Sequence, residues 1–157
     1  MQKLYWEDFQ IGDRREYGGH TVTKEEIVRF AKEFDPQPFH LDEEAARQSH
    51  FGGLVASGWQ SAGFFMRMLV DNALAGAQSM GSPGVEWLRW RKPVYVGDTL
   101  HVRQEIVDKR PSRNHDNMGH VKNRFEVLNQ NGEVVMEMES YGMFLRRPAD
   151  EREETAR

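Results

Sequence analysis

The stretch from Ser57 to Leu74, SGWQSAGFFMRMLVDNAL, decides the fold of this chain. Arg67 and Asp71 are its only charged residues. Apolar side chains at helical spacing form one stripe along this segment: Ala62, Phe65, Met66, Leu69, Val70 and Ala73. Three further uncharged residues lie outside the stripe: Gly63, Phe64 and Met68. A helix that is apolar on nearly all sides is expected to be buried on nearly all sides. We therefore predict one long, central helix.

The start of this helix is a candidate binding point for negative charge. Ser57 and Gln60 have the spacing of a capping box, which makes Gly58 the first helical residue. The amide of Gly58 then has no partner within the helix, and the helix dipole favours negative charge there. A glycine lets a ligand oxygen approach that amide. The alternative is that Gly58 only admits a tight turn into the helix.

The remaining chain is mostly strand-like. Apolar residues alternate with polar ones, and Asn131-Gly132 is a strong hairpin signal. The predicted strands cover residues 15–22, 85–96, 100–107, 121–127 and 134–144, with a loop at 110–119. One long apolar helix and several antiparallel strands favour an α+β fold in which a curved sheet wraps around the helix, the hot-dog arrangement.

The segment Asp35–His40, DPQPFH, carries the residues most suited to catalysis. It follows a predicted helix that is opened by a capping box of Thr23 and Glu26, and its two prolines prevent that helix from continuing. We expect residues 35–39 to be extended or turning, and stiff enough to direct a carboxylate and an imidazole toward one water molecule. The alternative is that Asp35 caps a turn and His40 is an ordinary boundary residue.

Composition limits the functional classes. The chain has 157 residues, a net charge of −4 and no cysteine. The acidic balance argues against nucleic acid as a partner, and the lack of cysteine excludes thiolate chemistry. No apolar stretch is long enough to span a membrane and no signal peptide is evident, so we expect a cytoplasmic protein. We expect one domain over residues 1–147 and a frayed, charged tail over residues 148–157.

Several motifs together resemble those of the MaoC-like dehydratases, which include the (R)-specific enoyl-CoA hydratases. The likeness covers residues 5–147. The matching segments are Glu7-Asp8-Phe9-x-x-Gly12-Asp13, Asp35-x-Gln37-Pro38-x-His40, Phe51-Gly52-Gly53, Ser57-Gly58 and Pro93-Val94-x-x-Gly97-Asp98-x-Leu100.

This resemblance implies a hot-dog fold, a homodimer or higher homo-oligomer, and a coenzyme A or acyl-carrier-protein thioester as substrate. It places catalytic roles on Asp35, His40 and the oxyanion-binding amide of Gly58. Gln37 stands where the family more often has Asn, and Ser57 where many members have His. These departures leave the Asp–His pair intact and bear on the identity of the substrate.

The expected activity is reversible hydration of a trans-2-enoyl-CoA to a (3R)-3-hydroxyacyl-CoA, without metal or cofactor. Candidate substrate-binding residues are Gln37, Phe39, Ser57, Trp59, Phe64 and Arg91. Core packing is the alternative for Trp59 and Phe64, and a solvated charge cluster is the alternative for Arg91. His115, Asp116 and His120 lack a clear third ligand for a metal site.

Two other functions remain open. One is a thioesterase on the same fold, although Asp71 lies nearly four turns from Gly58, too far for a catalytic carboxylate. The other is a non-catalytic subunit that binds acyl thioesters.

Overall fold

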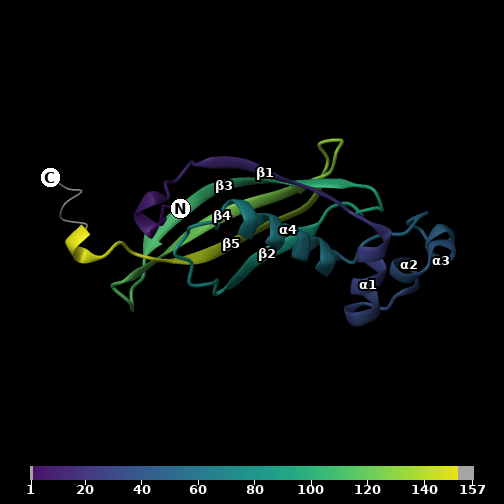
Figure 1. Ribbon diagram of the computed structural model, residues 1–157, viewed down its shortest axis with the longest axis horizontal. Coiled ribbons are helices and arrows are strands. Elements are labelled where there is room, and N and C mark those ends of the chain that lie inside the picture. Colours follow the sequence, from purple (N-terminus) through teal and green to yellow (C-terminus); the bar gives the residue numbers. More distant parts are fainter. Residues whose placement is uncertain (1, 152–157) are drawn as a thin grey trace.

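The computed structural model describes residues 2–151, and its centre is an antiparallel sheet with one long helix against it. The elements are η1 (Trp6–Asp8), β1 (Arg14–Thr21), α1 (Lys24–Phe34), α2 (Pro38–Leu41), α3 (Glu43–Gln48), α4 (Gly58–Asn72), β2 (Gly84–Trp90), β3 (Thr99–Pro111), β4 (Met118–Leu128) and β5 (Val134–Leu145). The five strands lie in the order β1-β3-β4-β5-β2 (Figure 1).

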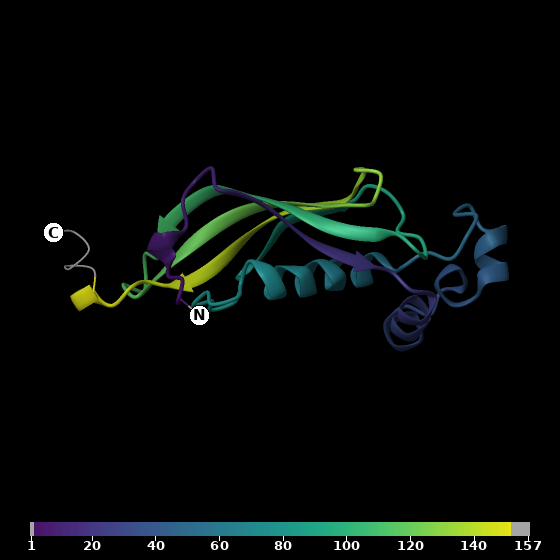
Figure 2. The same ribbon diagram turned by 45° about the horizontal axis from the view of Figure 1, so that its top comes forward.

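The sheet is curved and arches over α4, which confirms the predicted hot-dog arrangement (Figure 2). Each of its four strand pairs contains a register shift. Such shifts bend a strand and increase its twist, so they help the sheet to curve. At the shift in β1, Gly18 has a φ of 120°, and an added Cβ there would lie 2.5 Å from the sulfur of Met68. A glycine therefore lets β1 pass close to α4.

The core lies between α4 and the concave face of the sheet. Phe65 and Leu69 of α4 pack with residues that alternate along β3, β4 and β5, including Val102, Phe125 and Met138. The rings of Phe65 and Phe125 are 4.8 Å apart. Burial of side chains of this size contributes about 1.5–3 kcal/mol each, so this layer fixes where α4 lies.

The expectation that α4 is buried on nearly all sides is wrong. Trp59, Met66 and Val70 are 66%, 46% and 46% exposed, and with Gly63 they form one face of the helix. Helical spacing shows how many sides are apolar but not how many sides a single sheet can cover.

Several predicted boundaries are also corrected. The strand predicted at 85–96 ends at Trp90, and the loop predicted at 110–119 is shorter because β3 runs to Pro111 and β4 begins at Met118. The capping box of Thr23 and Glu26 is confirmed. Helical backbone is present at residues 149–151, and residues 152–157 of the predicted tail lie outside the described residues. None of the helices in residues 2–151 combines the length and the apolar character that a bilayer crossing needs.

Candidate active site

Helices α1, α2 and α3 gather at one end of the sheet (Figure 1). Asp35 ends α1 and His40 lies in α2, on either side of the short turn that joins these helices. Asp35 caps the C-terminus of α1, and its amide donates to the carbonyl of Ala31. The expectation that residues 35–39 are only extended or turning is wrong at its end, because Pro38 begins the short helix α2. A proline at a first helical position loses no hydrogen bond, and its fixed φ suits the helix. This turn places His40 facing back toward Asp35.

The imidazole of His40 is held in one orientation by a backbone carbonyl. His40 is 5% exposed, and its Nδ1 lies 2.6 Å from the carbonyl oxygen of Val55. A carbonyl oxygen only accepts, so Nδ1 is the protonated nitrogen. Nε2 then lies 3.3 Å from Oδ2 of Asp35. In the neutral ring Nε2 carries a lone pair, which is the form that accepts a proton.

The carboxylate of Asp35 is kept ionised by its neighbours. Burial raises its pKa, but the pKa falls overall because the side chains of Gln37, Ser57 and His40 stabilise the charged form. Gln37 donates from Nε2 to Oδ1 of Asp35 at 2.7 Å. The Ser57 hydroxyl lies near this carboxylate and lowers its pKa, yet within residues 2–151 it makes no hydrogen bond of ordinary geometry. Oδ2 of Asp35 and Nε2 of His40 therefore lie side by side at the border of the same cavity.

Gly58 begins α4, as predicted, but the predicted capping box at Ser57 is wrong. The Ser57 side chain makes no cap hydrogen bond, and the Gln60 side chain donates instead to the carbonyl of Glu26. Within the described chain the Gly58 amide has no hydrogen-bond partner. The amide is therefore available to an oxygen outside the chain, at the positive end of the helix dipole.

A side chain that the sequence did not indicate explains why residue 58 is glycine. An added Cβ at Gly58 would lie 2.5 Å from the indole ring of Trp90, whose Nε1 donates to the Gly58 carbonyl at 2.8 Å. Gly58 has no positive φ, so the turn itself does not require a glycine. The glycine is required by the indole that packs on it, and no periodic signal in the sequence pairs these two residues.

The first cavity, as we name the space around these groups, has a volume of about 370 Å³. It is bordered by Asp35, His40 and Gly58 and by five of the six candidate substrate-binding residues: Gln37, Phe39, Ser57, Trp59 and Arg91. The sixth, Phe64, is not brought to it. The ring of Phe64 stacks on His20 at 4.5 Å and borders a different hollow next to α1.

The cationic side chains near the first cavity have carboxylate partners. Arg91 donates from Nε to the buried Glu137 at 2.7 Å, and Lys92 pairs with Glu133. Arg91 is therefore at the cavity border but not a free cation. Across residues 2–151 no three side chains of His, Cys, Asp or Glu gather as metal ligands. His120 lies in β4 rather than in a loop, paired with Arg110 of β3.

Comparison with known proteins places this architecture in a family. The model of the MaoC like domain matches residues 8–128. Protein YdeM of Bacillus subtilis is 35% identical over 69% of this chain and 77% of its own length. The 3-hydroxybutyryl-CoA dehydratase of Methylorubrum extorquens is 30% identical over 72% of this chain and 70% of its own.

Solved structures agree with these relatives. A MaoC-like dehydratase from Rhodospirillum rubrum has a TM-score of 0.85 and 46% identity, covering 92% of this chain and 99% of that one. The unliganded R-hydratase of Pseudomonas aeruginosa has a TM-score of 0.77 and 26% identity, covering 93% of this chain and 88% of that one. The chain belongs to the MaoC-like domain family, which includes hydratases and dehydratases.

Proposed function

We propose that the protein is a hydro-lyase that reversibly hydrates a trans-2-enoyl-CoA to a (3R)-3-hydroxyacyl-CoA. The observation that carries this proposal is the orientation of His40. Its Nδ1 is committed to the Val55 carbonyl and its Nε2 lies 3.3 Å from an ionised Asp35, in a cavity that an unpaired Gly58 amide also borders.

Asp35 and His40 together would hold a water molecule in a reactive orientation. When the imidazole is neutral, Asp35 Oδ2 and His40 Nε2 are both acceptors, so one water would donate one hydrogen to each. The water oxygen then directs its lone pairs away from the two residues, toward the β-carbon of the substrate. General acid–base catalysis of this kind contributes about 10²- to 10⁴-fold in rate.

The Gly58 amide would stabilise the charge that this attack creates. When the water oxygen bonds to the β-carbon, the π electrons shift toward the thioester oxygen and form an enolate. A preorganised N–H donor to such an oxygen is worth about 3–4 kcal/mol in the transition state. The water's proton passes to the Asp35–His40 pair, which returns a proton to the α-carbon on the same face. Hydroxide and proton are thus both added, and dehydration is the reverse.

The thioesterase alternative finds less support in the site. Asp71 is the carboxylate of α4, and its Oδ2 lies 2.7 Å from Nε of Arg67 on the exposed side of the helix. It is not among the residues that border the first cavity. A purely acyl-binding subunit has no use for a carboxylate that is kept ionised next to an oriented imidazole.

The test uses trans-2-butenoyl-CoA and follows loss of the absorbance of the conjugated double bond. We expect turnover by the wild type and a loss of at least about 100-fold in kcat for Asp35→Asn and for His40→Gln. Asp71→Asn is the matched control and should keep wild-type activity, because its carboxylate lies outside the cavity. Release of free coenzyme A thiol, or full activity in both site variants, would overturn the proposal.

We propose further that two copies associate through the exposed face of α4. Trp59, Met66 and Val70 lie on this face, next to the edge strand β2 with its exposed Val85 and Trp90. The rings of Trp59 and Trp90 are in contact, 5.0 Å apart, and exposed apolar surface that joins two elements is typical of an interface between proteins. The occupant we infer is a second copy, because β2 is the last strand of the sheet within residues 2–151 and an identical β2 can continue it. Trp59 and Trp90 also border the first cavity, so such a partner would close its mouth.

A further inference from the structure

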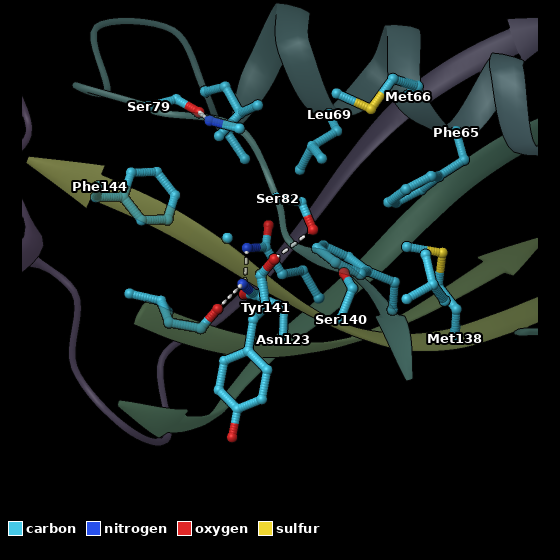
Figure 3. Close-up of a pocket in the computed structure, with 18 of the residues that line it drawn as sticks. Phe65, Met66, Leu69, Ser79, Ser82, Asn123, Met138, Ser140, Tyr141 and Phe144 are labelled. Atoms are coloured by element: carbon cyan, nitrogen blue, oxygen red, sulfur yellow. Dashed lines mark hydrogen bonds between the residues drawn. The ribbon is translucent and has the colours of Figure 1, made fainter. Parts of the chain in front are cut away.

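A second cavity lies between the C-terminal half of α4 and the sheet, away from Asp35 and His40 (Figure 3). Its volume is about 230 Å³, below the range of about 300–1,000 Å³ that is usual for drug-sized ligands. Apolar side chains form most of its walls, among them Leu69, Met138 and Phe144. The shape and the chemistry of the walls suit a narrow, chain-like apolar ligand.

The sheet side of the second cavity is polar, which an apolar chain alone does not explain. Gln104 of β3, Asn123 of β4 and Ser140 of β5 border it and are 8%, 6% and 9% exposed. Asn123 and Ser140 lie directly opposite each other in the β4–β5 pair. Figure 3 shows them on the sheet, opposite Leu69 and Met66 of α4. Polar groups buried this deeply are normally hydrogen-bonded.

The hydrogen bonds inside the protein use only part of the hydrogen-bonding capacity of this group. Tyr17 donates to Oε1 of Gln104 at 2.8 Å, and Nε2 of Gln104 donates to Oδ1 of Asn123 at 2.8 Å. Among residues 2–151, Nδ2 of Asn123 then has only the Val121 carbonyl, at 3.5 Å. Within residues 2–151 the Ser140 hydroxyl makes no hydrogen bond. The Asn123 amide nitrogen, with one long hydrogen bond, and the Ser140 hydroxyl can therefore still bind a ligand in this mostly apolar cavity.

We propose that the second cavity binds the remote part of the acyl chain, and that Asn123 and Ser140 hydrogen-bond an oxygen carried there. The inference rests on the proposed function and names its substrate class: thioesters whose acyl chain carries a hydroxyl or carbonyl oxygen far from the reacting double bond. A hydroxyl both donates and accepts, so it pairs with either end of the Asn123 amide and with Ser140.

The same two elements, α4 and β2, line both cavities. Trp59 of α4 and Trp90 of β2 border the first cavity, and Met66 of α4 and Val85 of β2 border the second. All four side chains are exposed and apolar. Gly58 and Leu69 are eleven residues apart, or about 16 Å along α4. An extended chain advances about 1.2 Å per bond, so the oxygen lies roughly 13 bonds from the thioester.

The test compares kcat/KM for 2-enoyl-CoA thioesters with and without a terminal hydroxyl, at chain lengths from about 8 to 16 carbon atoms, which bracket that reach. For the wild type we expect the hydroxylated chain to be preferred by about 2- to 10-fold at the longer lengths, as one or two hydrogen bonds supply. Ser140→Ala and Asn123→Leu should reduce this ratio to one or below. Met138→Leu, which changes the same wall without removing a donor, should keep it.

A wild-type ratio at or below one at every length would overturn the inference, as would an unchanged ratio in both variants. Activity on trans-2-butenoyl-CoA separates this failure from failure of the proposed function, since that chain is too short to reach the second cavity. If butenoyl-CoA is not hydrated, the hydratase proposal fails. The binding of saturated acyl-CoAs with and without the terminal hydroxyl, measured by calorimetry, then tests the second cavity independently of catalysis. The expected ratios of affinity, for the wild type and for each variant, are the same as the ratios of kcat/KM given above.

Discussion

Substitution of Gly58 by alanine places a methyl group where the indole ring of Trp90 lies. The added Cβ would be 2.5 Å from Cε2 of Trp90, whereas carbon atoms in favourable contact are about 3.5–4.0 Å apart. The ring must therefore move by about 1 Å, which breaks its hydrogen bond to the Gly58 carbonyl. Overpacking costs about 1–3 kcal/mol and a lost hydrogen bond about 0.5–1.5 kcal/mol. Because Trp90 is 44% exposed and can turn partly into solvent, we expect a total loss of about 1–3 kcal/mol.

The assay is urea unfolding of wild type and variants, followed by circular dichroism, together with thermal midpoints. A loss of this size lowers the midpoint by about 3–10 °C in a chain of this length. Gly53→Ala is the matched control, because its Cβ would meet Tyr95 at an ordinary 3.7 Å and should change the free energy of unfolding by less than about 0.5 kcal/mol. In a Trp90→Leu background the Gly58→Ala cost should largely vanish. An equal cost in both backgrounds would refute the explanation by the indole contact.

Three more outcomes are expected. Gln37→Leu removes the hydrogen bond that stabilises ionised Asp35, so the pKa of Asp35 rises and the acid limb of the pH profile of kcat/KM moves to higher pH. Acid limbs at the same pH in wild type and variant would contradict this. Gly119→Ala places a Cβ 2.4 Å from the Trp6 indole and should lower the free energy of unfolding by about 1–3 kcal/mol in the same urea assay, whereas unchanged stability would show that the indole moves freely. Met66→Glu puts a charge on the exposed α4 face and should shift the mass measured by light scattering toward one chain; a wild type that is already a single chain would exclude association through this face.

The sequence predicted the strands and the start of α4 well because their signals are local. Alternation of apolar and polar residues depends on the strand's own two faces, and β3, β4 and β5 were all located by it. The hairpin turn after β4 and the Thr23 cap are equally local. The predicted ends of the strands were less accurate, because a strand continues as long as a neighbouring strand offers hydrogen bonds. Here β3 and β4 pair with each other into the segment 110–119 that was predicted to be a loop.

The site was predicted in part. The sequence placed Asp35 and His40 on one stiff segment, but it did not show the Val55 carbonyl that orients the imidazole, because that contact joins segments fifteen residues apart. Trp90 was missed for the same reason. Phe64 was misplaced because helical spacing does not say which face of α4 meets the sheet.

The polar group of the second cavity was hidden in a regular pattern. Asn123 occupies an inward position in β4 between Val121 and Phe125, so alternation alone marked it as one more core residue. Only the packing of three strands shows that Asn123 meets Gln104 and Ser140 and that space remains beside them.

The most direct measurement of the central claim is the reaction of trans-2-butenoyl-CoA in deuterated water, with the product analysed by NMR. If Asp35 and His40 handle both the water and its proton, the deuterium at C2 and the hydroxyl at C3 are added to the same face, and the product has the (3R) configuration. Asp35→Asn should then abolish the product without unfolding the protein. Addition to opposite faces, or product formed at the wild-type rate by Asp35→Asn, would contradict the account.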